Sequence, residues 1–474
     1  MAGVFRFVYF CRKLIRMTLI KSISGIRGVI GTGLTPPEII RYSLAYGAFQ
    51  KARTGRERIK IVIGRDARIS GKMMFNLVSG ALLGSGADVI DLGLAATPTV
   101  EIAVPGTNSD GGIIITASHN PAQWNALKLL NEKGEFLSAE EGQMILDLAE
   151  KNHFEYVETD NLGRYSRDYT WLEQHIRKII ELPLVNTSAI RNARLNVVFD
   201  AVNSVGGIAL PMLLEALEVS QVIKLNAKPD GKFTHNPEPL PENLSELSQA
   251  VVKNKANVGI AVDPDVDRLA IVMENGGFFG EEYTLVSVAD YVLKEKPGNS
   301  VSNLSSSRAL QVITEKHGGK YYASAVGEVN VVEMMKACQA VIGGEGNGGV
   351  IIPELHYGRD ALVGIALFLS HLALSGMSCS ALRKTYPDYH ISKNKMTLKP
   401  GIDLKELFDH IKLKYHSYPL NETDGLRIDF ENGWVHLRQS NTEPIIRIYA
   451  EAPAREEAEK YAQAVINDIS AWTC

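Results

Sequence analysis

Residues 258–268 read VGIAVDPDVDR. The apolar run at 258–262 predicts a buried β-strand, because strands that are covered on both faces carry continuous apolar side chains. A polar loop follows directly, at the usual position of ligand-binding residues in open α/β sheets. This stretch therefore predicts an α/β fold with a ligand site at the carboxyl ends of its strands.

The same pattern of an apolar run followed by a polar loop recurs along the chain. Such runs lie at 59–63, 113–116, 195–200 and 340–342, and a helix-like stretch near 73–83 precedes another strand at 88–92. Alternating strands and helices indicate parallel sheets, and 474 residues are too many for one core, so we expect related α/β units in tandem. Strands at 434–437 and 445–449 and a helix from about residue 455 predict a smaller α+β module at the C-terminus.

Composition excludes several classes of protein. Lys and Arg number 50, Asp and Glu number 54, and the net charge is −4, which predicts neither a nucleic-acid partner nor a membrane partner. The four cysteines are scattered without a C-x-x-C pair, so their pattern indicates neither a disulfide framework nor a zinc site, and we expect a cytoplasmic protein. Residues 1–16 place basic residues after an apolar run, the reverse of a signal peptide, and we interpret them as an upstream extension before a natural start at Met17.

The acidic loop 263–268 carries aspartates at every second position. Asp263, Asp265 and Asp267 share one face of an extended backbone, and three adjacent carboxylates repel one another unless a cation neutralises them. Oxygen ligands of this kind suit Mg²⁺ together with a substrate phosphate, which Arg268 would also neutralise. Two alternatives stay open: a solvated acidic turn, and an aspartyl-phosphate nucleophile at Asp263 with Asp265 as its acid/base partner.

Two further loops have the composition of a sugar-phosphate site. Residues 343–349 read GGEGNGG and precede a strand rather than a helix, which excludes a dinucleotide site and leaves Glu345 and Asn347 to bind adjacent sugar hydroxyls. Residues 438–447 read RQSNTEPIIR, and their guanidinium and hydroxyl groups suit a phosphate dianion; these residues are Arg438, Ser440, Asn441, Thr442 and Arg447. The alternatives are a plain glycine turn and a hairpin turn with incidental arginines.

The stretch 114–128, IITASHNPAQWNALK, delivers a serine and a histidine to a turn at the end of an apolar run. Asn120 and Pro121 could cap a helix. The sequence after them instead predicts a strand at 126–130, a turn and a strand at 135–137, so 121–125 is interpreted as a tight loop. An unactivated serine is a poor nucleophile, and no catalytic triad is spelled out around Ser118.

The stretches TASHNP, DPDVDR, GEGNGG and RQSNTEP, in this order and spacing, resemble the α-D-phosphohexomutase superfamily of phosphoglucomutases, phosphomannomutases and phosphoglucosamine mutases. The resemblance covers nearly the whole chain from Met17. It implies four domains around a central cleft, three related α/β units and a smaller C-terminal α+β domain. We place them at residues 17–158, 159–257, 258–378 and 379–474.

The resemblance also implies functional residues. Ser118 would carry a phosphoryl group and, with the three aspartates, bind one Mg²⁺ per chain; Glu345 and Asn347 would bind the sugar, and the 438–447 loop would bind the non-reacting phosphate. Lining the phosphoserine would be Arg27, His119, Lys128 and Arg268. Lys128 would be the base, with a pKa depressed by burial and nearby cations.

The implied reaction moves a phosphoryl group between the 6- and 1-positions of a hexose or hexosamine phosphate, with the sugar 1,6-bisphosphate as intermediate and activator. The start SISGIRG (22–28), the GEGNGG loop and Thr-Glu-Pro favour glucosamine phosphate, whereas DPDVDR resembles the phosphomannomutase/phosphoglucomutase enzymes. An aspartyl-phosphate phosphohydrolase and a catalytically silent sugar-phosphate binding protein remain alternatives. The chain is expected to be a monomer or homodimer.

Overall fold

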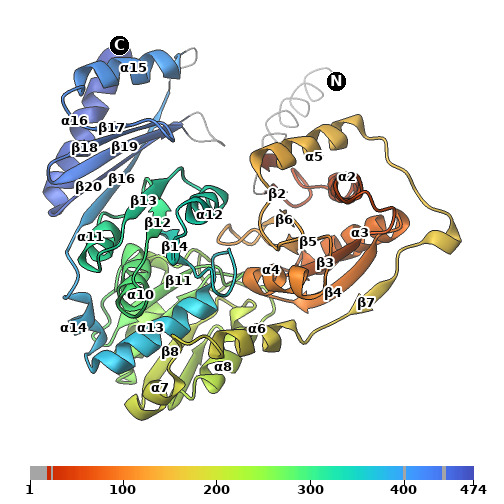
Figure 1. Cartoon of the computed structure of the whole chain (residues 1–474), viewed down its shortest axis with the longest axis horizontal. Coiled ribbons are helices and arrows are strands. Elements are labelled where there is room, and N and C mark those ends of the chain that lie inside the picture. The colour runs from red at the N-terminus through yellow and green to blue at the C-terminus, as the bar shows by residue number, and fades with distance from the viewer. Residues whose placement is uncertain (1–18, 23–24, 399–401, 440–444, 474) are drawn as a thin grey trace, which may run out of the picture.

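The computed structural model describes residues 19–22, 25–398, 402–439 and 445–473. The expected upstream extension lies outside these residues. Four β-sheets of seven, four, four and five strands organise the described chain, and Figure 1 shows each sheet with its own helices.

The first sheet has the strand order β1-β2-β6-β5-β3-β4-β7. Its central strands β3 and β5 are almost entirely buried and pair in parallel, as the continuous apolar runs predict. The strands are β1 (Leu19–Ser22), β2 (Gly25–Val29), β3 (Lys60–Arg65), β4 (Asp88–Leu94), β5 (Gly111–Ile115), β6 (Trp124–Leu130) and β7 (Tyr165–Arg167). The accompanying helices are α2 (Pro36–Thr54), α3 (Gly71–Gly84), α4 (Thr97–Gly106) and α5 (Ala139–Lys151).

The second and third sheets repeat the central part of the first. Each consists of three parallel strands and an antiparallel edge strand, in the orders β11-β10-β8-β9 and β15-β14-β12-β13, which correspond to β6-β5-β3-β4. The second unit contains α6 (Trp171–Ile180), α7 (Thr187–Ala193), β8 (Asn196–Asp200), α8 (Gly206–Ala216), β9 (Gln221–Leu225), α9 (Ser245–Lys253), β10 (Val258–Val262) and β11 (Leu269–Met273). The third contains α10 (Glu281–Glu295), β12 (Ser300–Asn303), α11 (Ala309–Lys316), β13 (Tyr321–Ser324), α12 (Glu328–Ala337), β14 (Ile342–Glu345), β15 (Gly349–Ile351) and α13 (Ala361–Ser375). The three related α/β units expected from the sequence are therefore present.

This repetition places the three predicted loops at equivalent positions. The serine loop joins β5 to β6, the acidic loop joins β10 to β11, and the glycine loop joins β14 to β15. In every unit the functional loop therefore connects the third strand to the antiparallel edge strand, at the carboxyl end of a parallel strand.

The pairing of the strands corrects the expected domain boundaries. β10 pairs in parallel with β8, so a boundary between residues 257 and 258 would divide the second sheet. β7 pairs with β4, so the first sheet extends beyond residue 158. The helix α14 (Cys379–Arg383) buries Cys379 and Leu382 in the core that contains α13, so the last unit begins after residue 379.

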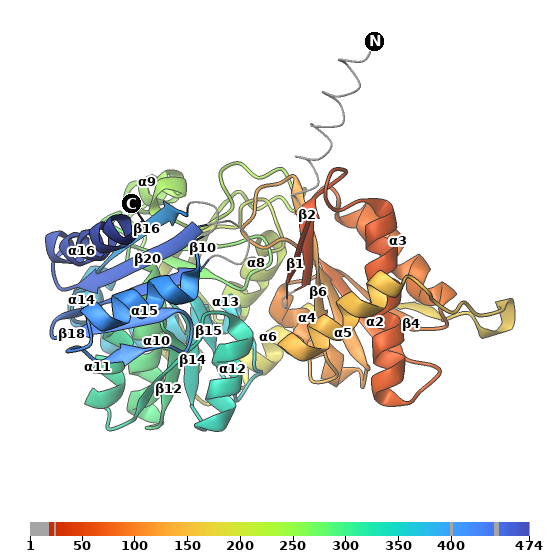
Figure 2. The ribbon, with the colours of Figure 1, turned by 90° about the horizontal axis from the view of Figure 1, so that it is seen from above.

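The C-terminal unit is a five-stranded sheet in the order β16-β20-β19-β18-β17 with two helices. It contains β16 (His390–Thr397), α15 (Leu404–Lys414), β17 (Leu420–Asn421), β18 (Leu426–Phe430), β19 (Gly433–Gln439), β20 (Ile445–Ala452) and α16 (Arg455–Thr473). All pairs in this sheet are antiparallel, in agreement with the predicted α+β module. Figure 2 shows this unit on the side of the molecule opposite the first unit.

The hydrophobic cores follow this organisation. One cluster joins the second and third units, because Phe368 of α13 and Phe279 belong to the same core as Phe199 of β8. The first and C-terminal units have clusters of their own. Within the described part of the chain, no helix is both long and apolar enough to cross a membrane.

Candidate active site

All four units contribute residues to one cleft of about 700 Å³. The three equivalent hairpin loops of the α/β units meet there, and the C-terminal unit adds a residue from β19. Among the residues that line the cleft are Arg27, Ser118, His119, Lys128, Arg268, Glu345, Asn347, Arg359 and Arg438. The sequence motifs, although far apart in the chain, therefore form one site.

Ser118 lies at the tip of the first hairpin in a strained, buried conformation. Its φ is +48°, a value that residues other than glycine rarely adopt, and Ser118 is 4% exposed. Its N–H donates to Thr116 Oγ1 (2.9 Å), and the Thr116 hydroxyl donates to Asp66 Oδ2 (2.7 Å). The guanidinium of Arg68 donates to the carbonyls of four residues of the loop, Ser118, Asn120, Pro121 and Trp124. The loop predicted at 121–125 is present but ends two residues earlier, because Trp124 and Asn125 already belong to β6.

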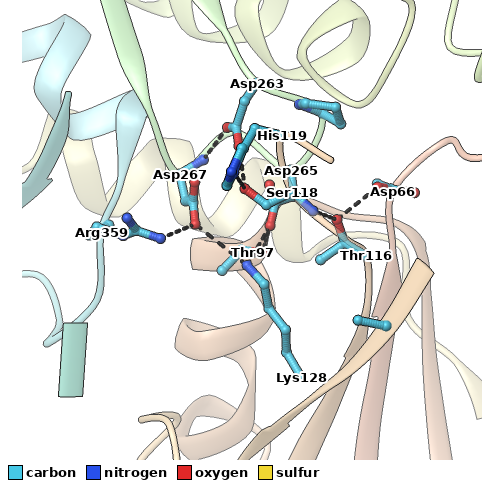
Figure 3. A network of polar contacts seen from close by, with 12 residues as sticks. Asp66, Thr97, Thr116, Ser118, His119, Lys128, Asp263, Asp265, Asp267 and Arg359 are labelled. Carbon is cyan, nitrogen blue, oxygen red and sulfur yellow. Dashed lines mark hydrogen bonds and ion pairs between the residues drawn. The ribbon is translucent and has the colours of Figure 1, made fainter. Parts of the chain in front are cut away.

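The three aspartates of the acidic loop are fully buried beside Ser118 (Figure 3). The Ser118 hydroxyl donates to Asp263 Oδ2 at 2.6 Å. Burial, together with Asp267 and Asp265, raises the pKa of Asp263 well above its usual range. Among the described residues, the Oδ1 atoms of Asp265 and Asp267 have no hydrogen-bond partner. Unpaired buried carboxylate oxygens are costly, so this donor set fits a hard divalent cation such as Mg²⁺.

Lys128, on β6, points into the same cluster. Its Nζ lies 2.7 Å from Asp265 Oδ2 and 3.5 Å from Asp267 Oδ2. Burial lowers the pKa of Lys128, but the carboxylates of Asp265 and Asp267 outweigh it and raise this pKa above its usual value. The expectation of a depressed pKa is therefore wrong for this arrangement, because the neighbours of the ammonium group are anions.

Three more predicted residues surround the serine. His119 Nδ1 lies 3.3 Å from Ser118 Oγ, and burial, then Arg268 and Arg27, lower the pKa of His119 to about 2, so its ring is neutral. Arg27 donates to Asn120 Oδ1 at 2.8 Å. Arg268 Nη1 donates to Glu238 Oε1 at 3.3 Å, while the Arg268 Nε is buried and has no partner among the described residues. The cleft thus holds two guanidinium groups near the serine that can receive a phosphate.

The sugar-binding candidates lie on the third hairpin. Glu345 Oε1 accepts from Asn303 Nδ2 (2.9 Å) and from the N–H of Gly327 (3.2 Å), so its carboxylate is fixed in orientation. Asn347 follows at the turn, and its Oδ1 accepts from the N–H of Gly349 at 3.3 Å. Gly348 has φ +87°, and a Cβ there would lie 2.3 Å from the carbonyl oxygen of Leu269, so the loop requires glycine at this position.

Arg359 is the main residue that the sequence motifs missed. It donates from Nη2 to Asp267 Oδ2 (2.7 Å), from Nη1 to Glu345 Oε2 (2.8 Å) and from Nε to Glu328 Oε2 (3.0 Å). The guanidinium group of Arg359 therefore joins the acidic loop of the second unit to the glycine loop of the third unit. The only signal in the sequence is the charged pair Arg359-Asp360 directly before the apolar helix 361–375.

The C-terminal unit presents a pair of arginines. Arg438 of β19 and Arg447 of β20 stand directly opposite each other in the antiparallel ladder. Arg438 lines the cleft, and its Nε lies 3.1 Å from Asp424 Oδ2. Ser440, Asn441 and Thr442 lie outside the described residues.

The fold and the site define the class of this protein. Three α/β repeats bring a buried serine, an acidic triplet and the glycine loop together at one cleft. This combination is typical of an enzyme of intramolecular phosphoryl transfer. Comparison of the sequence with known families identifies all four domains of the phosphoglucomutase/phosphomannomutase family, three alpha/beta/alpha domains at residues 19–156, 173–277 and 280–389 and the C-terminal domain at 395–468. The chain belongs to this family, the α-D-phosphohexomutases.

Individual relatives agree with this assignment along the whole chain. A phosphoglucomutase/phosphomannomutase of Thermococcus kodakarensis is 37% identical over 93% of this chain and 96% of its own length. A phosphoglucosamine/phosphogalactosamine mutase of Sulfurisphaera tokodaii is 32% identical over 94% of this chain and 97% of its own. The crystal structure of a phosphoglucomutase/phosphomannomutase family protein from Burkholderia thailandensis superposes with a TM-score of 0.81 at 25% identity and covers 96% of both chains.

Proposed function

We propose that this enzyme is a phosphoserine mutase that interconverts glucosamine 6-phosphate and glucosamine 1-phosphate. The observation that carries the proposal is the 2.6 Å hydrogen bond from the Ser118 hydroxyl to Asp263, which places a serine against an acidic triplet inside a cleft. A serine in this position suits storage of a phosphoryl group next to a divalent cation. The proposed metal ligands are Ser118, Asp263, Asp265 and Asp267, with one Mg²⁺ per chain.

The proposed reaction has two balanced half-steps. The P–O bond to Ser118 Oγ breaks, a sugar hydroxyl forms the new P–O bond, and the proton of that hydroxyl passes to Ser118 Oγ through the neutral ring of His119. The resulting 1,6-bisphosphate turns over in the cleft, and its other phosphoryl group returns to Ser118 by the reverse step. A bound Mg²⁺ supplies positive charge that stabilises the transferring phosphoryl group.

The remaining residues bind the two ends of the substrate. Arg27, Arg268 and Lys128 supply positive charge around the transferring group, while Arg438 and Arg447, with Ser440, Asn441 and Thr442, hold the non-reacting phosphate. Glu345 and Asn347 bind the sugar hydroxyls. A 1,6-bisphosphate added in small amounts is the proposed activator, because it loads the phosphoryl group onto Ser118.

The choice of a glucosamine phosphate rests on charge. The wall of the cleft formed by the third unit carries three carboxylates: Glu328 and Glu345 are paired with Arg359, and Glu333 is exposed in the cleft. An amino sugar brings a cationic group to these carboxylates, whereas glucose and mannose phosphates do not. The relative from Sulfurisphaera tokodaii carries an amino-sugar mutase name, which supports the same choice.

The test has two parts. kcat/KM is measured side by side on glucosamine, glucose and mannose phosphates with Mg²⁺, and the glucosamine substrate is expected to give the highest value. Intact mass should show a phosphate adduct that is lost in Ser118→Ala but retained in Ser166→Ala, a matched change at an exposed serine of β7. Full mutase activity in Ser118→Ala would refute the phosphoserine mechanism, and release of inorganic phosphate through a hydroxylamine-sensitive adduct would identify a phosphohydrolase instead.

A further inference from the structure

A second cluster of possible metal ligands lies where the three α/β units meet. Glu101 comes from α4 of the first unit, His175 from α6 of the second, and His356 and Asp360 from the segment between β15 and α13 of the third. His175 and Asp360 have completely buried side chains, and that of Glu101 is 1% exposed. None of these residues is needed by the proposed phosphoryl transfer.

The ligand atoms of the cluster converge on one point. Nε2 of His175 lies 2.8 Å from Asp360 Oδ2, and Nε2 of His356 lies 3.4 Å from the same oxygen. The other oxygen, Oδ1, accepts the N–H groups of Leu362 and Val363 at the first turn of α13. Asp360 is therefore fixed by helix capping, and its Oδ2 is directed at the two imidazoles.

The outer nitrogens of both imidazoles have partners that set the ring orientation. Nδ1 of His175 lies 3.0 Å from Thr99 Oγ1, and Nδ1 of His356 lies 3.3 Å from Glu101 Oε2. Histidines that bind metals characteristically place their second ring nitrogen on a carboxylate or another polar group, which directs the first nitrogen at the ion. Both rings here present Nε2 to the cluster in this way.

Glu101 adds a second buried carboxylate beside the cluster. Both of its carboxylate oxygens are buried and have no hydrogen-bond partner among the described residues. Its ion-pair partner is His356 Nδ1 at 3.3 Å, and a dication between the histidines would balance the charges of Glu101 and Asp360 together.

We propose that His175 Nε2, His356 Nε2 and Asp360 Oδ2 bind a divalent transition-metal ion, with Zn²⁺ as the preferred metal, and that Glu101 orients His356. Two imidazoles and a carboxylate suit Zn²⁺, whereas the all-oxygen aspartate triplet suits Mg²⁺. Its ligands would come from the second and third units, and Glu101 of the first unit would reach it through His356, so its role is structural. The proposal is independent of the proposed function.

A second pair of histidines provides a control. His317 Nε2 lies 2.7 Å from Asp290 Oδ1 and His371 Nε2 lies 4.0 Å from Asp290 Oδ2. Asp290 also contacts Lys316 Nζ at 3.3 Å and Tyr386 Oη at 3.4 Å, so its carboxylate already has cationic and hydroxyl partners. His317→Gln therefore removes one histidine near an aspartate without affecting the proposed site.

The experiment uses the full chain, treated with a chelator, dialysed, and saturated with millimolar Mg²⁺ to fill the aspartate triplet. Zn²⁺ is then added, and bound zinc is counted by mass spectrometry after gel filtration. We expect one zinc ion per chain, a rise in the apparent Tm, and X-ray absorption at the zinc edge that shows two imidazole ligands. Zinc uptake should be lost in His356→Gln and retained in His317→Gln.

The measurements on the wild-type protein keep the test decisive even if His356→Gln folds poorly. Absence of zinc uptake in the Mg²⁺-saturated protein, or a zinc shell of oxygen ligands alone, would overturn the proposal. His356 would then serve only as a bridge between Glu101 and Asp360, whose oxygens lie 3.3 and 3.4 Å from its ring nitrogens. Loss of zinc in His317→Gln but not in His356→Gln would also overturn it, by placing the ion at Asp290.

Discussion

Replacement of Arg359 by lysine is expected to disable the enzyme without unfolding it. The Arg359 guanidinium contacts three carboxylates on three sides, from the acidic loop, the sugar loop and the start of α12. A lysine keeps the charge, but one ammonium group lacks the planar fork that reaches all three partners. We therefore expect Glu345 and Asp267 to lose their common orientation.

The size of the effect depends on how many of these hydrogen bonds a lysine can replace. A hydrogen bond to a charged group contributes about 1.5–3 kcal/mol, and lysine retains at most one of the three. If lysine leaves two of these hydrogen bonds unmade in the transition state, at about 1.5 kcal/mol each, the activation free energy rises by about 3 kcal/mol. This corresponds to a fall of about 100-fold in kcat/KM. Complete removal in Arg359→Ala leaves three buried carboxylates without their cation and costs more.

The assay is the steady-state rate of each variant with its apparent Tm. Arg58→Lys is the matched control, since Arg58 forms an exposed fork on Asp88 (Nη2–Oδ1 2.7 Å) and its replacement should leave kcat/KM unchanged. In Arg359→Ala, millimolar guanidinium chloride should restore part of the activity, whereas methylammonium chloride at the same concentration should not. This rescue distinguishes orientation of the site from a general effect on stability.

One result would refute this reasoning about Arg359. If Arg359→Lys keeps kcat/KM within about threefold of the wild type with an unchanged Tm, the guanidinium does not couple the two loops. A fall in Tm with a proportional loss of active protein, and no change in kcat/KM per folded molecule, would equally limit Arg359 to a structural role.

Three further predictions concern other parts of the molecule. Burial raises the pKa of Glu282 to about 8. The folded state therefore binds more protons than the unfolded state between about pH 4.5 and 8, and the stability of the protein falls as pH rises through this window. Glu282→Gln should exceed the wild type in apparent Tm by about 4 °C at pH 8 but not at pH 5. Gly348→Ala should lower kcat/KM at least about tenfold, because its Cβ would meet the Leu269 carbonyl, whereas Gly318→Ala, with positive φ but open space, should not. Asp424→Asn should raise KM about tenfold with little change in kcat, because Arg438 loses its ionic partner; an unchanged KM would contradict this.

The loops of the site were predictable because each lies within a few consecutive residues. Ser118, the aspartate triplet and Glu345 are each carried by a short hairpin loop at the end of a buried strand, and continuous apolar runs identify such strands. What joins these loops was not predictable in the same way. Arg359 is 92 residues from Asp267 in the chain, and nothing near it in the sequence specifies that distant partner.

The predictions of the domain boundaries and of the Lys128 pKa were wrong for a related reason. Both depend on contacts between residues that lie far apart in the chain. The boundary expected between residues 257 and 258 falls at the start of β10, whose partner strand β8 lies much earlier in the chain, and nothing within β10 itself specifies that pairing. The sequence predicts a depressed pKa for Lys128, because it places several arginines in the same site. The structure places it against Asp265 and Asp267, so the sign of its pKa shift depends on contacts between two different units.

The segment between β15 and α13 connects two of the hairpin loops of the site. Arg359 extends from it to the acidic and sugar loops, while the adjacent Asp360 and the nearby His356 face Glu101 and His175 of the other two units. Asp360 also caps α13, whose buried side chains belong to the core that the second and third units share. A displacement of the first unit at Glu101 would therefore move His356, and with it Arg359, which lies three residues further along the chain. The contacts between the units and the contacts to the loops of the cleft begin on the same short, capped segment, so coupling between them requires no long pathway.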